Sequence, residues 1–127
     1  MTRTNGPASE AYSTRPNIGH FPTQEAALVA LVDQLVAQLD PFAIWLFGSR
    51  ARGNHRPDSD FDILVVSKPG QAWAGDYEKA YMATGATGLG CDVIPVSKAD
   101  FDEALSLHTS FVAMVVDEGR KLYEAKL

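Results

Sequence analysis

Two groups of residues have types and a spacing suited to phosphate chemistry. Gly48-Ser49 is separated by ten residues from the acidic pair in Asp60-Phe61-Asp62, and each group adjoins an apolar run. Successive side chains of a strand alternate between its faces, so we expect Asp60 and Asp62 to point the same way and Phe61 the other. Neighbouring carboxylates repel unless a cation lies between them, and two Mg2+ ions roughly 3.5–4 Å apart are the usual occupants in phosphoryl transfer. The pattern therefore predicts a magnesium site on Asp60 and Asp62.

The residues at and after the Gly48-Ser49 pair predict a phosphate-binding site. A glycine allows the backbone N–H groups to approach phosphate oxygens closely, and Ser49 adds a hydroxyl donor. Arg50 and Arg52 follow in the chain, so we expect both to lie beside a triphosphate, whereas we expect Arg56 to be solvated. Gly48, Ser49, Arg50 and Arg52 are thus the predicted nucleotide-binding residues.

A third carboxylate, Asp92, lies within a later apolar run at residues 91–96 that is predicted to form a strand. An acid flanked by Cys91 and Val93 on such a strand has few structural explanations, so Asp92 is a candidate functional residue. The expected ligands are oxygen atoms only, and no histidine or cysteine falls at a spacing typical of zinc, so Mg2+ is favoured. Asp60 and Asp62 are thus predicted to bind Mg2+, and the resemblance described next adds Asp92 to them as the third catalytic and metal-binding residue.

Taken together, the Gly-Ser pair, the Asp-x-Asp sequence and the later acid resemble the minimal nucleotidyltransferases of the polymerase-beta superfamily. The resemblance covers about residues 25 to 123. It implies that Asp60 and Asp62 hold one metal ion near the β- and γ-phosphates and share a second ion with Asp92. Asp92 would act either as the general base toward the acceptor or only as a ligand. The resemblance also implies ATP as the nucleotide substrate, while the residues themselves do not distinguish adenine from guanine.

Three functions are consistent with these residues and with the resemblance. First, the chain resembles the antitoxin of two-gene toxin–antitoxin pairs, which implies that it transfers AMP to a HEPN-type toxin, often on a tyrosine, and neutralises it. The small size and the lack of an acceptor-recognition domain in this sequence favour that acceptor. Second, it is similar to aminoglycoside nucleotidyltransferases, which modify small molecules; a homo-oligomer would then supply the second half of the acceptor pocket. Third, it is a non-catalytic binding module, although retention of all the motif residues argues against this.

Composition excludes several other classes of protein. The chain has 127 residues, of which 46% are hydrophobic and 21% charged, as expected for one soluble globular domain. A net charge of −5 argues against a processive polymerase or another protein that binds long nucleic acid. We expect no membrane span, because no apolar run approaches about 20 residues. The single cysteine, Cys91, fits a reducing cytoplasm.

The hydrophobic pattern predicts the elements that position these residues. Residues 1–20 are expected to form a flexible tail, and residues 21–127 a single nucleotidyltransferase domain. Thr23 is placed to cap a helix whose apolar stripe continues to Leu39, and Asp40-Pro41 ends it. Strands are predicted at 43–47, 60–66 and 92–96, with Pro95 favouring an edge position for the last of these. Further helices are predicted around 50–53, around 73–81 and from 98 to 119, before a short strand at 121–124.

This order predicts an α/β (α+β) fold. We expect a small mixed β-sheet with helices packed on one face, which is also the polymerase-beta-like nucleotidyltransferase fold that the resemblance implies. The open face of the sheet would carry the three aspartates.

Overall fold

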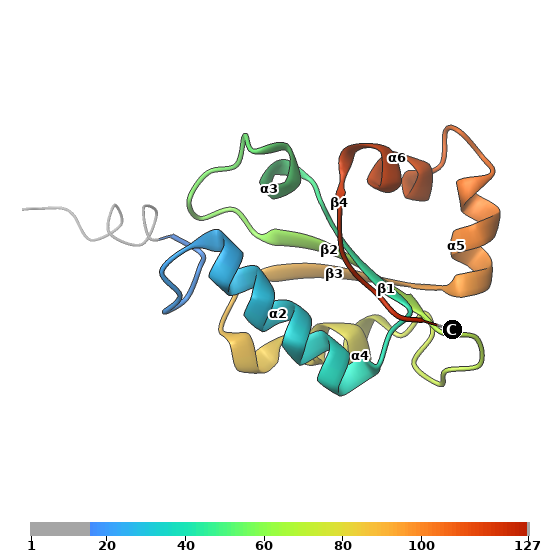
Figure 1. Ribbon diagram of the computed structural model, residues 1–127, viewed down its shortest axis with the longest axis horizontal. Helices are drawn as coiled ribbons and strands as arrows, with labels where there is room; N and C mark the ends of the chain where they lie inside the picture. Colours follow the sequence, from blue (N-terminus) through green and yellow to red (C-terminus); the bar gives the residue numbers. More distant parts are fainter. Residues whose placement is uncertain (1–15, 127) are drawn as a thin grey trace, which may run out of the picture.

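The structure, a computed structural model, describes residues 16–126 and contains a four-stranded mixed sheet (Figure 1). The strand order is β3-β2-β1-β4. Strand β2 is antiparallel to β1 and parallel to β3, and β4 is antiparallel to β1. The strands are β1 (Ala43–Phe47), β2 (Phe61–Ser67), β3 (Cys91–Ser97) and β4 (Arg120–Glu124). The predicted mixed sheet is confirmed, and β3 is an edge strand, as Pro95 indicated.

Helices lie on both sides of this sheet. They are α2 (Gln24–Leu39), α3 (Ser49–Arg52), α4 (Tyr77–Met82), the 3-10 turn η1 (Gly85–Thr87), α5 (Lys98–Leu105) and α6 (Phe111–Glu118). In Figure 1, α2 and α4 lie on one side of the sheet, and α5 and α6 lie on the other. The prediction that helices pack on one face only is therefore incomplete, because α5 and α6 cover part of the face expected to be open.

Helix α2 forms where the sequence predicts it. Thr23 is its N-cap, and the Oγ1 of Thr23 accepts a hydrogen bond from the backbone N–H of Ala26 at 3.1 Å. The helix ends at Asp40, which adopts a left-handed conformation (φ 47°) before Pro41. Its buried residues, Ala27, Leu28, Leu31, Leu35 and Leu39, form the stripe that packs on the sheet. Within residues 16–126, α2 and every other helix lack the length and apolar character needed to cross a membrane.

Strand β2 separates two hydrophobic cores. Phe61, Ile63 and Val65 pack with α2 and α4 on one face and are fully buried. Leu64 and Val66 point to the other face, where they pack with residues of α5 and α6: Phe101, Val112 and Val115. Alternation along the strand therefore places Asp62 on the α5/α6 face, at the end where β2 begins.

Residues 16–20 are held against the domain, which differs from the tail predicted over residues 1–20. The backbone N–H of Asn17 donates to the carbonyl oxygen of Pro57 at 2.7 Å, and the Asn17 side chain bonds to Ser59 and Gly90. Ile18 packs against the core beneath α2. The ordered domain thus begins before residue 21, and the rest of the predicted tail, residues 1–15, lies outside the described residues.

Candidate active site

The structure places Asp62 and Asp92 directly side by side. Strands β2 and β3 run parallel in a register that pairs Asp62 with Asp92, one residue after each strand begins. Paired residues on neighbouring strands project to the same face of a sheet, here the α5/α6 face. Asp62 is half-buried and Asp92 is exposed. The two acids that the sequence predicts on separate strands are therefore neighbours at one end of the sheet.

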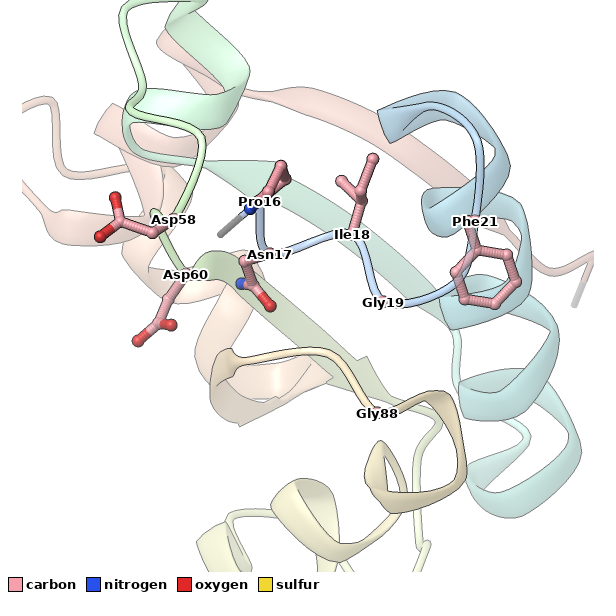
Figure 2. Close-up of a pocket in the computed structure, with 8 residues that line it drawn as sticks. All are labelled: Pro16, Asn17, Ile18, Gly19, Phe21, Asp58, Asp60 and Gly88. Atoms are coloured by element: carbon pink, nitrogen blue, oxygen red, sulfur yellow. The ribbon is translucent and has the colours of Figure 1, made fainter. Parts of the chain in front are cut away.

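Asp60 lies next to this pair, just before β2. A Cβ atom built on Gly90 would lie 2.6 Å from Oδ1 of Asp60, so the carboxyl group rests against the Gly90 backbone. Asp60 also lines an open cavity of about 610 Å³, together with Asp58, Gly88 and the segment that leads into α2 (Figure 2). Asp60 thus belongs both to the carboxylate cluster and to the wall of an adjoining cavity.

The electrostatics of Asp62 reflect all three acids. The pKa of Asp62 is raised from its ordinary value of 3.8, first by burial and then by the negative charges of Asp92 and Asp60. Arg52 acts in the opposite direction and lowers the pKa of Asp62. A carboxylate that is partly desolvated and repelled by two like charges is well disposed to accept a cation.

The Gly48-Ser49 turn lies against Asp62. Phe47, the last residue of β1, pairs with Asp62 across the antiparallel ladder, so the turn that follows β1 passes beside this carboxyl group. Gly48 has φ of 73°, and a Cβ atom there would overlap Oδ2 of Asp62. Glycine is therefore required both by the backbone conformation and by the closeness of the acid. Ser49 begins helix α3 immediately after this turn.

Arg50, which the sequence predicts to bind nucleotide, is buried in the protein. Arg50 is only 4% exposed, and its guanidinium carbon lies 4.4 Å from the centre of the Phe61 ring. Its Nε donates to the carbonyl of Ser59 at 2.8 Å, its Nη2 to the carbonyl of Pro57 at 2.7 Å, and its Nη1 to Oε1 of Gln24 at 2.8 Å. All three nitrogens thus have protein acceptors, and Arg50 anchors the loop before Asp60 to α2 and α3.

Arg52 remains the candidate cation of this site. Its side chain is 45% exposed and lies 3.9 Å from Glu118, a distance typical of a weak ion pair. It is also the positive charge that acts on Asp62. The sequence gives the same prediction for Arg50 and Arg52. In the structure Arg50 is buried, whereas Arg52 is exposed near the carboxylates.

The donor chemistry of the site fits Mg2+. The three carboxyl groups supply oxygen donors only, which is the set that a hard divalent cation prefers. In the part of the chain that the structure describes, no three Asp, Glu, His or Cys side chains are placed closely enough to hold a metal ion by themselves. Mg2+ in phosphate chemistry is commonly bound by one or two carboxylates together with substrate phosphates and water, so two neighbouring acids are sufficient protein ligands.

One residue of this region, Asn17, has no recognisable signature in the sequence. Asn17 lies in a segment rich in small and polar residues, yet its side chain joins the loop before β2 to the residue before β3. No local pattern signals this, because its partners are 42 and 73 residues away in the chain.

Two solved structures are similar to this chain over about three quarters of its length. A structure of a putative nucleotidyltransferase from Sulfolobus solfataricus is 21% identical, with a TM-score of 0.49, and the match covers 76% of this chain and 78% of that one. A toxin–antitoxin structure with AMP-PNP is 24% identical, with a TM-score of 0.47, and covers 76% of this chain and 73% of that one.

Sequence comparison is more specific. Spectinomycin 9-adenylyltransferase from Campylobacter jejuni is 36% identical over 52 residues, which are 41% of this chain and 20% of that protein. The match thus spans one fifth of that relative's length. The model of the nucleotidyltransferase domain family matches residues 30–122, which include the Gly48-Ser49 turn and all three aspartates. The chain belongs to the nucleotidyltransferase domain family.

Proposed function

We propose that the protein is a Mg2+-dependent nucleotidyltransferase that transfers AMP from ATP to the hydroxyl group of an acceptor. The observation that carries this proposal is the pairing of Asp62 with Asp92 beside the Gly48-Ser49 turn. Two adjacent carboxylates at the edge of a phosphate-binding turn are what this reaction requires. The adenylyl transfer named in the Campylobacter relative supports AMP as the group transferred.

In the proposed reaction the acceptor oxygen forms a bond to the α-phosphorus of ATP, the bond from that phosphorus to the bridging oxygen breaks, and pyrophosphate leaves. Asp62 and Asp92, with Asp60 beside them, would hold Mg2+ together with the phosphates of ATP. When bound, Mg2+ stabilises negative charge on the phosphoryl oxygens. Asp92 is exposed and Asp62 is half-buried, so Asp92 would take the acceptor proton, or it would serve only as a ligand and the proton would pass to solvent.

The remaining residues of the site would bind the nucleotide. The Gly48 backbone would approach the phosphates closely, and the Ser49 hydroxyl would donate a hydrogen bond to a phosphate oxygen. Arg52 would supply positive charge to the triphosphate from its exposed position near Asp62. Arg50 would contribute only by holding the loop before Asp60 in place.

For the acceptor, we propose a partner protein of the HEPN toxin type, which this protein would neutralise as an antitoxin. Its resemblance to such antitoxins motivates the proposal, and exposed apolar side chains near the site support a protein partner. Phe111 is 42% exposed, and Met114, one turn later on α6, is 36% exposed. The Phe111 ring packs edge-on against Phe47 at 5.2 Å, one residue from the Gly48 turn. Exposed apolar groups that cluster at one place commonly mark protein-binding surfaces.

A small-molecule acceptor is the second candidate. The cavity beside Asp60 favours it, because its volume of about 610 Å³ falls within the range of small-ligand sites (Figure 2). The named activity of the Campylobacter relative points in the same direction.

The test is transfer of label from α-labelled ATP in the presence of Mg2+ and lysate from the protein's own host. Products are separated on a denaturing gel and by thin-layer chromatography. Asp62→Ala removes a proposed ligand, and Asp33→Ala, an exposed acid on α2, is the matched control for loss of a carboxylate. We expect a labelled protein band with the wild type and with Asp33→Ala, and none with Asp62→Ala.

Each alternative gives a different result. Label that migrates as a small molecule and depends on Asp62 would support the second acceptor. Label that persists with Asp62→Ala would overturn the assignment of the carboxylates. If no label transfers while the protein still binds a partner, the protein acts by contact alone and the proposed transfer is wrong.

A further inference from the structure

The side chain of Asn17 lies between the starts of the two strands that carry the aspartates. Its Nδ2 donates to the carbonyl oxygens of Ser59 and Gly90, each at 2.9 Å, and its Oδ1 accepts from the N–H of Gly90 at 2.8 Å. Ser59 precedes Asp60, and Gly90 lies two residues before Asp92. One amide group therefore links the Asp60 side of the site to the Asp92 side. Figure 2 shows Asn17 beside Asp60 at the beginning of β2.

Arg50 and Asn17 bind the same two carbonyl groups. The Ser59 oxygen accepts from Arg50 Nε at 2.8 Å and from Asn17 Nδ2, and the Pro57 oxygen accepts from Arg50 Nη2 and from the Asn17 backbone N–H, each at 2.7 Å. These bonds fix the loop before Asp60. Of the two residues, Asn17 is the one whose side chain continues to β3, through both polar groups of Gly90.

The side chains of Asn17 and Asp60 pack closely against the backbone of Gly90. A Cβ atom on Gly90 would lie 3.1 Å from Asn17 Nδ2 and 2.6 Å from Asp60 Oδ1. The amide of Asn17 and the carboxyl of Asp60 therefore both pack against the same glycine. A shift of the Asn17 side chain would therefore change the packing of the Asp60 carboxyl group against Gly90.

We infer that Asn17 is a positioning residue of the carboxylate site, which sets the separation between Asp60 on the β2 side and Asp92 on the β3 side. This inference rests on the proposed function, since it concerns the same metal-binding acids. In this role Asn17 acts through the two acids. Its role resembles that of the outer residues of metal sites, whose loss commonly weakens metal binding by about 10- to 100-fold.

Gln71 provides a matched control elsewhere in the molecule. Its Nε2 donates to the carbonyls of Leu39 and Asp40 at 3.1 and 2.9 Å, and its Oε1 accepts from the N–H of Lys68 at 2.7 Å. It thus makes the same three kinds of bond as Asn17, but after the end of β2 and away from the aspartates. Truncation of either side chain removes two donated bonds and one accepted bond.

The experiment measures binding of Mn2+ alone, by electron paramagnetic resonance, to the full chain and to Asn17→Ala, Gln71→Ala and Asp62→Ala. Thermal melting of each variant is recorded beside it. We expect both amide variants to melt at lower temperature than the wild type. We expect Mn2+ binding to weaken about tenfold or more in Asn17→Ala and to stay unchanged in Gln71→Ala. A merely structural role for Asn17 would lower the melting temperature without that difference.

The outcomes separate this inference from the proposed function. Weakened Mn2+ binding in Asp62→Ala together with unchanged binding in Asn17→Ala would overturn the role of Asn17 alone. Unchanged binding in Asp62→Ala would overturn the proposed metal site itself. If Asn17→Ala does not fold, Asn17→Ser is used in its place, because the shorter hydroxyl side chain cannot reach both carbonyls. Wild-type binding by that variant would equally overturn the inference.

Discussion

The two faces of strand β2 differ sharply in what they carry. On the α2/α4 face, Phe61, Ile63 and Val65 are fully buried in a continuous apolar core. On the α5/α6 face, Leu64 and Val66 are buried in the same way, but Asp62 occupies the first position of that row. At this end of the face Asp62 is only half-buried, and its neighbour Asp92 of β3 is exposed.

The difference shows how one strand serves both stability and the proposed chemistry. Burial of the large side chains on the α2/α4 face contributes about 1.5–3 kcal/mol for each residue. That contribution holds β2 in register and offsets the repulsion of Asp62 by Asp60 and Asp92. The apolar face keeps the acids in place, although the acids themselves favour separation.

The largest effect is expected from Ile63→Ala. Ile63 is fully buried beneath α2, so its truncation leaves a cavity and should lower the free energy of unfolding by about 2–5 kcal/mol. Urea denaturation measures this change. Asp62→Ala, one residue earlier on the other face, should instead retain the fold. A similar loss of stability in both variants would mean that Asp62 contributes to folding as much as the apolar face does.

A smaller effect on stability is expected from Arg50→Ala. The change removes three hydrogen bonds of a buried cation and leaves the carbonyls of Pro57 and Ser59 without these donors, so we expect a loss of about 2–3 kcal/mol. Arg52→Ala on the same helix should change stability by less than about 0.5 kcal/mol, since its ion pair with Glu118 is exposed. Thermal and urea denaturation measure the free energy of unfolding of the two variants. Equal losses would contradict the structural role assigned to Arg50.

Gly48→Ala should reduce the proposed AMP transfer by at least about tenfold. The new Cβ atom would overlap Oδ2 of Asp62, and displacement of a catalytic group lowers the reaction rate steeply. Gly53→Ala is the control. Gly53 also has positive φ (84°), but nothing lies within 4 Å of a Cβ there. Both variants carry the backbone strain, so only Gly48→Ala should lose activity beyond its loss of stability. Equal activity would show that the turn does not act through Asp62.

The smallest effect is a pH-dependent change in melting temperature. The pKa of Asp62 is raised in the folded state, so below its ordinary value of 3.8 the group is protonated in both states and carries no penalty. As pH rises through the folded-state pKa, ionisation in the folded state destabilises the protein. In the absence of divalent cations, Asp62→Asn should therefore melt a few degrees higher than the wild type at about pH 8. Near about pH 3.5 the two proteins should melt at the same temperature. A pH-independent difference would indicate that charge repulsion is not its cause.

Much of the fold and part of the site could be predicted from local patterns. The α2 stripe, the strand around residues 43–47 and the later strand at Asp92 follow from spacing that each segment carries within itself. The Asp-x-Asp spacing also fixes Asp62 opposite to its buried neighbours, because alternation along a strand needs no other partner. These features depend on residues a few positions apart, which is why the sequence alone determined them.

Other features depended on where distant segments meet. Arg50 and Arg52 are alike in sequence, but only the packing of Phe61, Gln24 and the loop at Pro57 decides that Arg50 is buried. The pairing of Asp62 with Asp92 is a register between strands 30 residues apart, and the bonds of Asn17 span 42 and 73 residues. Helices α5 and α6 cover the second face because the core there needs apolar partners. Such choices are made by tertiary packing, since burial and hydrogen bonding are completed by residues that no local window contains.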